Sequence, residues 1–185
     1  MRRDVLGSLV LLVVVAVLVL RPWEGEEELP ATAAAVVTRV VDGDTVEARV
    51  GGGVEDVRLI GVDTPETVKP DAPVECFGPE ASAFTHEVLE GERVRLVFGE
   101  EQRDRYGRLL AYVYLAPQEP TGSPALRERT TPGRGRPVFI NAALVRRGLA
   151  RTLTIPPNDR FAGRLRRLEL RAARAGRGLW GACGP

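Results

Sequence analysis

Residues 58–66 read Arg-Leu-Ile-Gly-Val-Asp-Thr-Pro-Glu, and the stretch changes character halfway along. Its first half is a short apolar run of strand-forming residues, which predicts a β-strand. Its second half supplies a carboxylate, a hydroxyl, a proline and a second carboxylate within four positions. Pro65 restricts its own φ and favours an extended conformation of Thr64. We therefore expect Asp63 and Glu66 on a stiffened turn at the end of a strand.

Arg58 lies inside this apolar strand, where a charge is costly unless it is paired. One interpretation is a structural salt bridge beside an ordinary polar turn, because clusters of perturbed charges are often structural. The other is a site for phosphate chemistry, because a buried cation and two fixed acids at one sheet rim suit a phosphate and a hard metal ion. The stretch on its own allows both interpretations.

Alternating apolar and polar residues predict further strands on both sides of this stretch. The strands are expected within Thr38–Val50, which bends at Asp42-Gly43-Asp44, and at Val57–Val62, Arg93–Phe98 and Leu109–Leu115. Helical spacing and end signals predict helices from Pro79 to Gly91, at Val138–Arg147 and from Phe161 to Gly176. This order predicts a mainly β chain with α-helices, an OB-fold five-stranded β-barrel with about three helices. Barrels of this type commonly bind nucleic acid on one face.

The charge of the chain is unevenly distributed along its 185 residues, which are enough for one domain with a substantial core. The formal net charge is only +1, but residues 121–185 contain 14 arginines against three acids. Such a basic half indicates either a polyanionic partner or a solvated helix face. His86 is the only histidine and falls on the polar side of its helix, which argues against histidine-based catalysis.

Residues 1–23 have the features of a membrane-targeting segment. Two arginines precede the uncharged apolar run Val5–Leu20, and Trp23 follows it. We expect an uncleaved N-terminal membrane anchor or a cleaved signal segment. The protein is therefore expected to be exported, either anchored on the extracytoplasmic side or secreted. Residues 24–35 are interpreted as a linker and residues 36–183 as a single domain.

The chain contains two cysteines, Cys76 and Cys183, whose spacing fits no metal motif. In an exported protein they are expected to form a disulfide that closes a long loop. The alternative is two separate thiols. The Pro-, Gly- and Arg-rich residues 116–137 predict an excursion on the surface, either disordered or in contact with a nucleic acid.

Three oxygen donors are expected to meet where two strands end. Asp44 follows a glycine turn and Asp63 ends the neighbouring strand, so their carboxylates can share a cation. The extended Thr64 can add its backbone carbonyl oxygen. Carboxylate, carbonyl and water oxygens form a site for a hard cation such as Ca²⁺.

Glu66 and two arginines complete this candidate site. Glu66 lies slightly further along the chain and can face a water molecule. Arg58 and Arg108 carry planar guanidinium groups that suit phosphate oxygens.

Five blocks of sequence, in this order, closely resemble the thermonuclease (staphylococcal nuclease-like) family. The blocks are 42–45, 58–67, 78–84, 104–108 and 143–150, within a resemblance that runs from about Val36 to Trp180. The resemblance implies an OB-fold enzyme that hydrolyses phosphodiester bonds of DNA and RNA with Ca²⁺ and leaves 3′-phosphates. It matches Asp44, Asp63 and the Thr64 carbonyl to the metal ligands. It matches Glu66 to the proposed general base, and Arg58 and Arg108 to the pair that neutralises charge on the reacting phosphate.

The sequence departs from the family pattern in two places. Residues 152–157 lack two tyrosines that help to form the nucleotide pocket in the best-known member, although Tyr106 is kept. Residues 116–137 are longer than the tight turn expected there. The first difference implies weaker base stacking and a different nucleotide preference.

Two functional hypotheses follow from these residues. The leading hypothesis is an exported Ca²⁺-dependent endonuclease, acting as a monomer on DNA, RNA or both. The alternative is a non-catalytic OB-fold module that binds nucleic acid without cutting it. Such modules are expected to lack the acids or the arginines of the site, whereas all six residues are present here.

Overall fold

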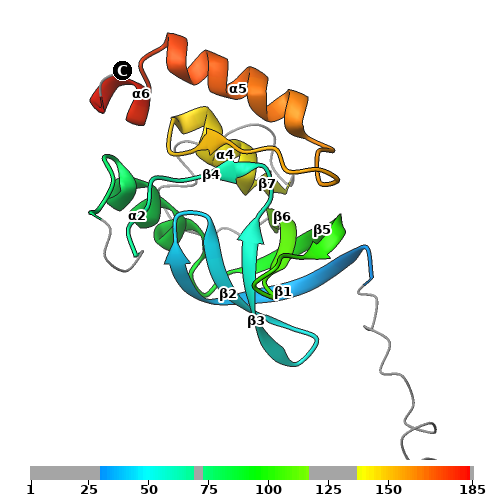
Figure 1. Ribbon diagram of the computed structural model, residues 1–185. Coiled ribbons are helices and arrows are strands. Elements are labelled where there is room, and N and C mark those ends of the chain that lie inside the picture. The colour runs from blue at the N-terminus through cyan, green and yellow to red at the C-terminus, as the bar shows by residue number, and fades with distance from the viewer. Residues whose placement is uncertain (1–29, 69–72, 117–136, 184–185) are drawn as a thin grey trace, which may run out of the picture.

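Five strands form the centre of the molecule in a computed structural model that describes residues 30–68, 73–116 and 137–183 (Figure 1). They are β1 (Thr32–Asp42), β2 (Thr45–Val50), β3 (Gly53–Leu59), β5 (Arg93–Arg103) and β6 (Leu109–Leu115). Their order is β3-β2-β1-β5-β6, and β3 also pairs with β6, which closes the barrel. The closing pair is parallel, and the other four pairs are antiparallel. This closed barrel confirms the predicted OB-fold type.

Helices cover two parts of the barrel, and Figure 1 shows α4 and α5 together on one side of it. The helices are α2 (Gly78–Leu89), α4 (Ile140–Arg147), α5 (Ala162–Arg174) and the single turn α6 (Leu179–Ala182). Three two-residue strands complete the described part: β4 (Val62–Asp63), β7 (Val138–Phe139) and β8 (Arg151–Thr152). β7 extends the sheet beside β6, while β4 and β8 form a separate pair. The three longer helices match the predicted number.

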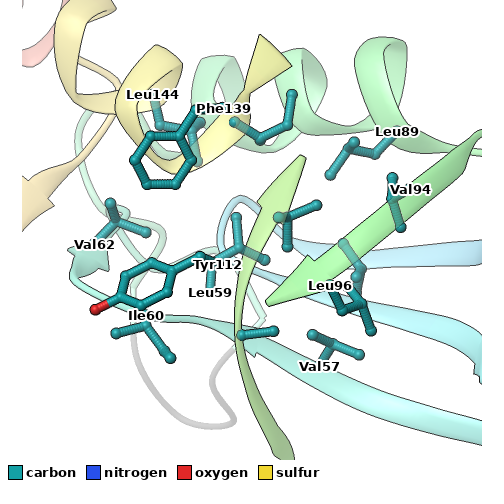
Figure 2. Packing of buried hydrophobic residues seen from close by; sticks show 14 of the residues in the cluster. Val57, Leu59, Ile60, Val62, Leu89, Val94, Leu96, Tyr112, Phe139 and Leu144 are labelled. Atoms are coloured by element: carbon teal, nitrogen blue, oxygen red, sulfur yellow. The ribbon is translucent and has the colours of Figure 1, made fainter. Parts of the chain in front are cut away.

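The core fills the barrel and continues between the barrel and the helices. Figure 2 shows Leu59, Leu96 and Tyr112 within this cluster, and each is at most 2% exposed. The Tyr112 ring meets Phe139 and Phe161 edge-on, with ring centroids 6.1 and 4.7 Å apart. Edge-to-face aromatic contacts of this kind stabilise a core beyond the area they bury. The barrel thus gives the residues at its rim a rigid support.

Several predicted boundaries differ from the structure. β5 continues to Arg103 beyond the expected end at Phe98, and Val138–Phe139 form β7 ahead of the helix that was expected to begin at Val138. The strand expected at Val57–Val62 is interrupted, because Gly61 adopts a φ of +79° and the chain turns between β3 and β4. A side chain at that position would also meet Leu165 at 2.7 Å. The linker expected at 24–35 ends earlier than predicted, because Thr32 already pairs with Val97 of β5. The small residues at 32–35 are typical of a linker, but they also fit a strand that pairs with a neighbour.

The structure contains the expected disulfide between Cys76 and Cys183, whose Cα atoms are 5.7 Å apart. The predicted membrane segment 1–23 lies outside the described residues, as does nearly all of the 116–137 insertion. Within the described residues, no helix is long and apolar enough to cross a membrane.

Candidate active site

Arg58 joins the two predicted metal carboxylates at the rim of the barrel. Its guanidinium forms an ion pair with Asp44, which lies in the turn between β1 and β2. Arg58 Nη2 also lies 2.9 Å from Asp63 Oδ1, at the end of β4. The Thr64 backbone N–H donates a 2.8 Å hydrogen bond to Asp44 Oδ2. Four of the six predicted residues are therefore in direct contact.

The environments of the two carboxylates differ. The Asp44 side chain is only 8% exposed, whereas the Asp63 side chain is 55% exposed. Burial raises the pKa of Asp63 above its usual value, Arg58 counteracts this, and the negative charge of Asp44 raises it further. Asp44 and Asp63 carry two negative charges and share one positively charged partner, Arg58. The remaining negative charge at this partly buried place favours binding of a second cation.

The donor set at this place suits a hard cation. Asp44 and Asp63 offer carboxylate oxygens, and Thr64 contributes polar oxygens beside them. The Thr64 hydroxyl is buried and has no hydrogen-bond partner among the described residues, so this place contains an unsatisfied polar group. No group of three or more His, Cys, Asp or Glu side chains in the described ranges could hold a metal ion. A cation here would therefore depend on two carboxylates, the Thr64 carbonyl and water.

Glu66 lies on the turn after β4, close to the buried Asp42. The sequence pattern predicted Asp42 only as part of a bend. Glu66 Oε1 accepts hydrogen bonds of 2.9 Å from the backbone N–H groups of Thr67 and Val68. Asp42 Oδ1 accepts a 2.6 Å hydrogen bond from the Thr67 hydroxyl and a 2.7 Å bond from the Gly43 N–H. Asp42 thus ties the Glu66 turn to the turn that carries Asp44, one of the two predicted metal carboxylates.

The pKa of Asp42 is raised by its burial, although the hydrogen bonds from Thr67 and Gly43 lower it. The nearby charge of Asp44 and a hydrogen bond with Glu66 also raise this pKa. A register shift between Val40 and the end of β1 marks an irregularity where the acid sits. The signal in the sequence was Asp42, the first acid of the Asp-Gly-Asp turn, whereas only the second acid, Asp44, was predicted to belong to the site.

Two buried polar side chains fix the turns around the site. The Thr85 hydroxyl of α2 donates a 2.7 Å hydrogen bond to the Gly43 carbonyl. The Asn141 amide of α4 donates a 2.8 Å hydrogen bond to the Ile60 carbonyl and accepts a 2.9 Å bond from the Val113 N–H. Neither role was predicted, because the sequence pattern does not place a helix residue against a turn far away in the chain.

A buried glutamate of α5 supports the strand that ends in Asp63. β4 pairs with β8 through Val62 and Thr152. Glu169, 5% exposed, accepts hydrogen bonds of 2.8 Å from the Thr152 N–H and 2.7 Å from its hydroxyl. Burial alone would raise the pKa of Glu169, but these bonds and Arg166 lower it overall. The C-terminal helix is thereby connected to the candidate metal site.

Arg108 contacts a different acid from the two that Arg58 contacts. Its Nε and Nη2 atoms are both 2.7 Å from Asp104 Oδ2. Burial alone would raise the pKa of Asp104, but hydrogen bonds from Arg108 and from nearby N–H groups lower it overall. The next residue on the same side of β6, Leu110, is in register with Arg58 of β3. The two arginines therefore lie toward one face of adjacent strands, and the Arg108 guanidinium lies 5.4 Å from the centroid of the exposed Tyr106 ring.

The barrel topology defines an OB-fold protein. Its rim carries two aspartates, a glutamate and two arginines, which are residue types suited to phosphate chemistry. A sequence model of the family described as Staphylococcal nuclease homologue matches residues 56–182. The chain belongs to this family. It is 35% identical to a thermonuclease of Staphylococcus intermedius, over 97% of this chain and 99% of that protein. It is 38% identical to a thermonuclease of Staphylococcus hyicus, over 78% of this chain and 73% of that protein. Endonuclease YncB of Bacillus subtilis (strain 168) is 31% identical over 79% of this chain and 61% of its own length.

Proposed function

We propose that this protein is an exported Ca²⁺-dependent nuclease that hydrolyses phosphodiester bonds of DNA, RNA or both. The observation that carries the proposal is the contact of Arg58 with both Asp44 and Asp63, with Glu66 on the adjoining turn. Membership of the family and the names of the relatives, thermonuclease and endonuclease, support the same chemistry.

Asp44, Asp63 and the Thr64 carbonyl would hold the Ca²⁺ ion. When bound, Ca²⁺ lowers the charge barrier to attack on the phosphate and helps to orient it. The carboxylates that would hold Ca²⁺ are the ones that Arg58 contacts in the structure. With the cation on these carboxylates, the Nη groups of Arg58 would be available to phosphate oxygens.

Glu66 would bind the attacking water and take its proton. The water oxygen would form a bond to phosphorus as the bond from phosphorus to the 5′ oxygen breaks, and the 5′ oxygen would leave with the electron pair and take a proton from solvent water to become a 5′-hydroxyl. The product then carries a 3′-phosphate. Arg58 and Arg108 would donate hydrogen bonds to the phosphate oxygens as negative charge develops on them, a contribution whose loss costs about 10²–10³ in rate per donor.

Helix α5 offers a surface for the rest of a polyanionic substrate. Four exposed arginines recur along it at helical spacing, and none forms an ion pair with a residue that the structure describes: Arg164, Arg167, Arg171 and Arg174. Such a row attracts phosphates along a strand of nucleic acid without reading its sequence.

Export is part of the proposal, with residues 1–23 as a membrane anchor or a cleaved signal segment. A disulfide supports this location, because disulfides persist in oxidising compartments. We further propose that the enzyme acts as a monomer, because the six site residues all come from one chain.

Cleavage of single-stranded DNA by the full chain, with Ca²⁺ and with a chelator, tests the proposal. We expect Ca²⁺-dependent cleavage that Glu66→Gln reduces by about 10²-fold or more. Glu80→Gln on the exposed side of α2 is the matched control and should keep wild-type turnover. DNA binding without cleavage in Ca²⁺ would instead establish the non-catalytic binding module.

A further inference from the structure

Glu75 holds the backbone of Glu66 from both sides. The Glu75 N–H donates a 2.9 Å hydrogen bond to the Glu66 carbonyl. In return, Glu75 Oε2 accepts a 3.2 Å hydrogen bond from the Glu66 N–H. One residue therefore satisfies both backbone polar groups of the candidate base, on a turn outside the barrel sheet.

The position of Glu75 is itself fixed at two points. Its carbonyl accepts a 3.0 Å hydrogen bond from the N–H of Gly78, the first residue of α2. An added Cβ at Gly78 would lie only 3.1 Å from the carbonyl oxygens of Glu66 and Pro65, so the start of α2 packs closely against this turn. The next residue after Glu75 is Cys76, which the disulfide joins to the end of α6.

The far end of the disulfide is anchored at the C-terminal end of α4. Leu179 of α6 is buried, and its N–H donates a 2.9 Å hydrogen bond to the carbonyl of Gly148. The Cys183 N–H donates a 3.1 Å bond to the Leu179 carbonyl. Cys76 is therefore tied to a fixed point of the fold, not to a free chain end.

A carboxylate at position 75 has an electrostatic disadvantage, because the Glu75 charge adds to the factors that raise the pKa of Asp63. A carboxylate oxygen gives in exchange a stronger hydrogen bond to the Glu66 N–H than a neutral acceptor would. The Glu75 charge thus disfavours the charged form of Asp63, whereas the Glu75 hydrogen bond fixes the backbone of Glu66. Fixing the backbone of Glu66 is what a positioning residue requires.

We propose that Glu75 is a positioning residue for Glu66, and that the Cys76–Cys183 disulfide keeps it in place. The inference rests on the proposed nuclease function. It predicts that turnover depends on the oxidised state of the protein. Cys76 is exposed, so a reductant can reach the bond.

The first test compares Glu75 variants of the full chain. Glu75→Ala should lower kcat about tenfold or more with KM nearly unchanged, because small displacements of a catalytic group are costly in rate. Glu75→Gln keeps an oxygen acceptor and should keep most of the turnover. Glu87→Ala, on the exposed side of α2, is the control. In a Glu66→Gln background the Glu75→Ala change should have almost no further effect, because it acts through the missing base.

Amide hydrogen exchange gives a readout that does not require activity. Glu75→Ala should remove the protection of the Glu66 N–H while the amides of β5 and β6 stay protected. Reductant should lower both this protection and the turnover of the wild type. The Cys76→Ser/Cys183→Ser protein should start low in both and no longer respond.

Several results would overturn the inference. They are equal losses of turnover in both backgrounds, an unchanged Glu66 amide in Glu75→Ala, or full turnover of a wild type whose thiols are demonstrably reduced. A wild type without Ca²⁺-dependent cleavage would overturn the proposed function and the catalytic part of this inference. The exchange measurement would then still decide whether Glu75 and the disulfide hold the Glu66 turn.

Discussion

Replacement of Asn141 by alanine is expected to destabilise the protein strongly through two specific hydrogen bonds. The side chain is fully buried, donates to the Ile60 carbonyl at 2.8 Å and accepts from the Val113 N–H at 2.9 Å. Both partner residues are buried as well, so water does not readily replace the lost amide. Each orphaned group costs about 1–3 kcal/mol, which gives about 2–6 kcal/mol for the pair.

Urea unfolding followed by circular dichroism measures this loss. With an m-value of about 2 kcal/mol/M, the midpoint should fall by about 1–3 M. Arg146→Ala on the exposed side of the same helix is the control, since surface substitutions usually change stability by about 0.5 kcal/mol or less. A midpoint for Asn141→Ala within the range of this control, at an unchanged m-value, would refute the reasoning. It would mean that the two backbone groups find other partners.

Three further outcomes are expected. The Cys76→Ser/Cys183→Ser protein should lose about 5 kcal/mol of unfolding free energy in urea, because the bond spans a separation of 107 residues; a loss below about 1 kcal/mol would contradict the chain-entropy argument. Replacing Arg167 and Arg171 by glutamine should make the slope of log affinity for single-stranded DNA against log salt shallower by about 1.4, and an unchanged slope would remove α5 from the binding surface. The folded-state pKa of Glu169 is lowered, so its contribution is complete above the unfolded pKa and is lost as the pH falls through the folded value. The wild type should therefore lose more stability than Glu169→Gln between about pH 6 and about pH 3, and equal losses would contradict this role.

Local sequence signals predicted the architecture well because the deciding patterns are local. Strand alternation, the glycine turns and the helix ends all depend on neighbouring residues, and they were sufficient for the barrel and its three main helices. The errors lie at boundaries. Gly61 interrupts a run that reads as one strand, and the small residues 32–35 pair with β5 although they resemble a linker.

The candidate site could be predicted only in part for the same reason. The two aspartates lie at strand ends and Arg58 lies in a strand. Residue type and strand pattern together were therefore enough to predict Asp44, Asp63 and Arg58. Asn141 acts on Ile60 across a separation of 81 residues, and Glu169 acts through a short strand pair that has no sequence signature. Such residues are recognisable only when packing places them, because a buried polar residue on a helix has the same local pattern whichever turn it contacts.

The disulfide also determines when the site can be completed during synthesis. The residues that carry the chemistry lie between Asp44 and Arg108, but a contact that holds their scaffold comes from Cys183, 107 positions after its partner Cys76. Chains emerge from the ribosome N-terminal end first, at about 5–20 residues per second. A nascent chain that already contains all six site residues therefore still lacks this crosslink. If the disulfide positions Glu66 as we propose, full activity is reached only after the C-terminal helices have emerged and the thiols have been oxidised.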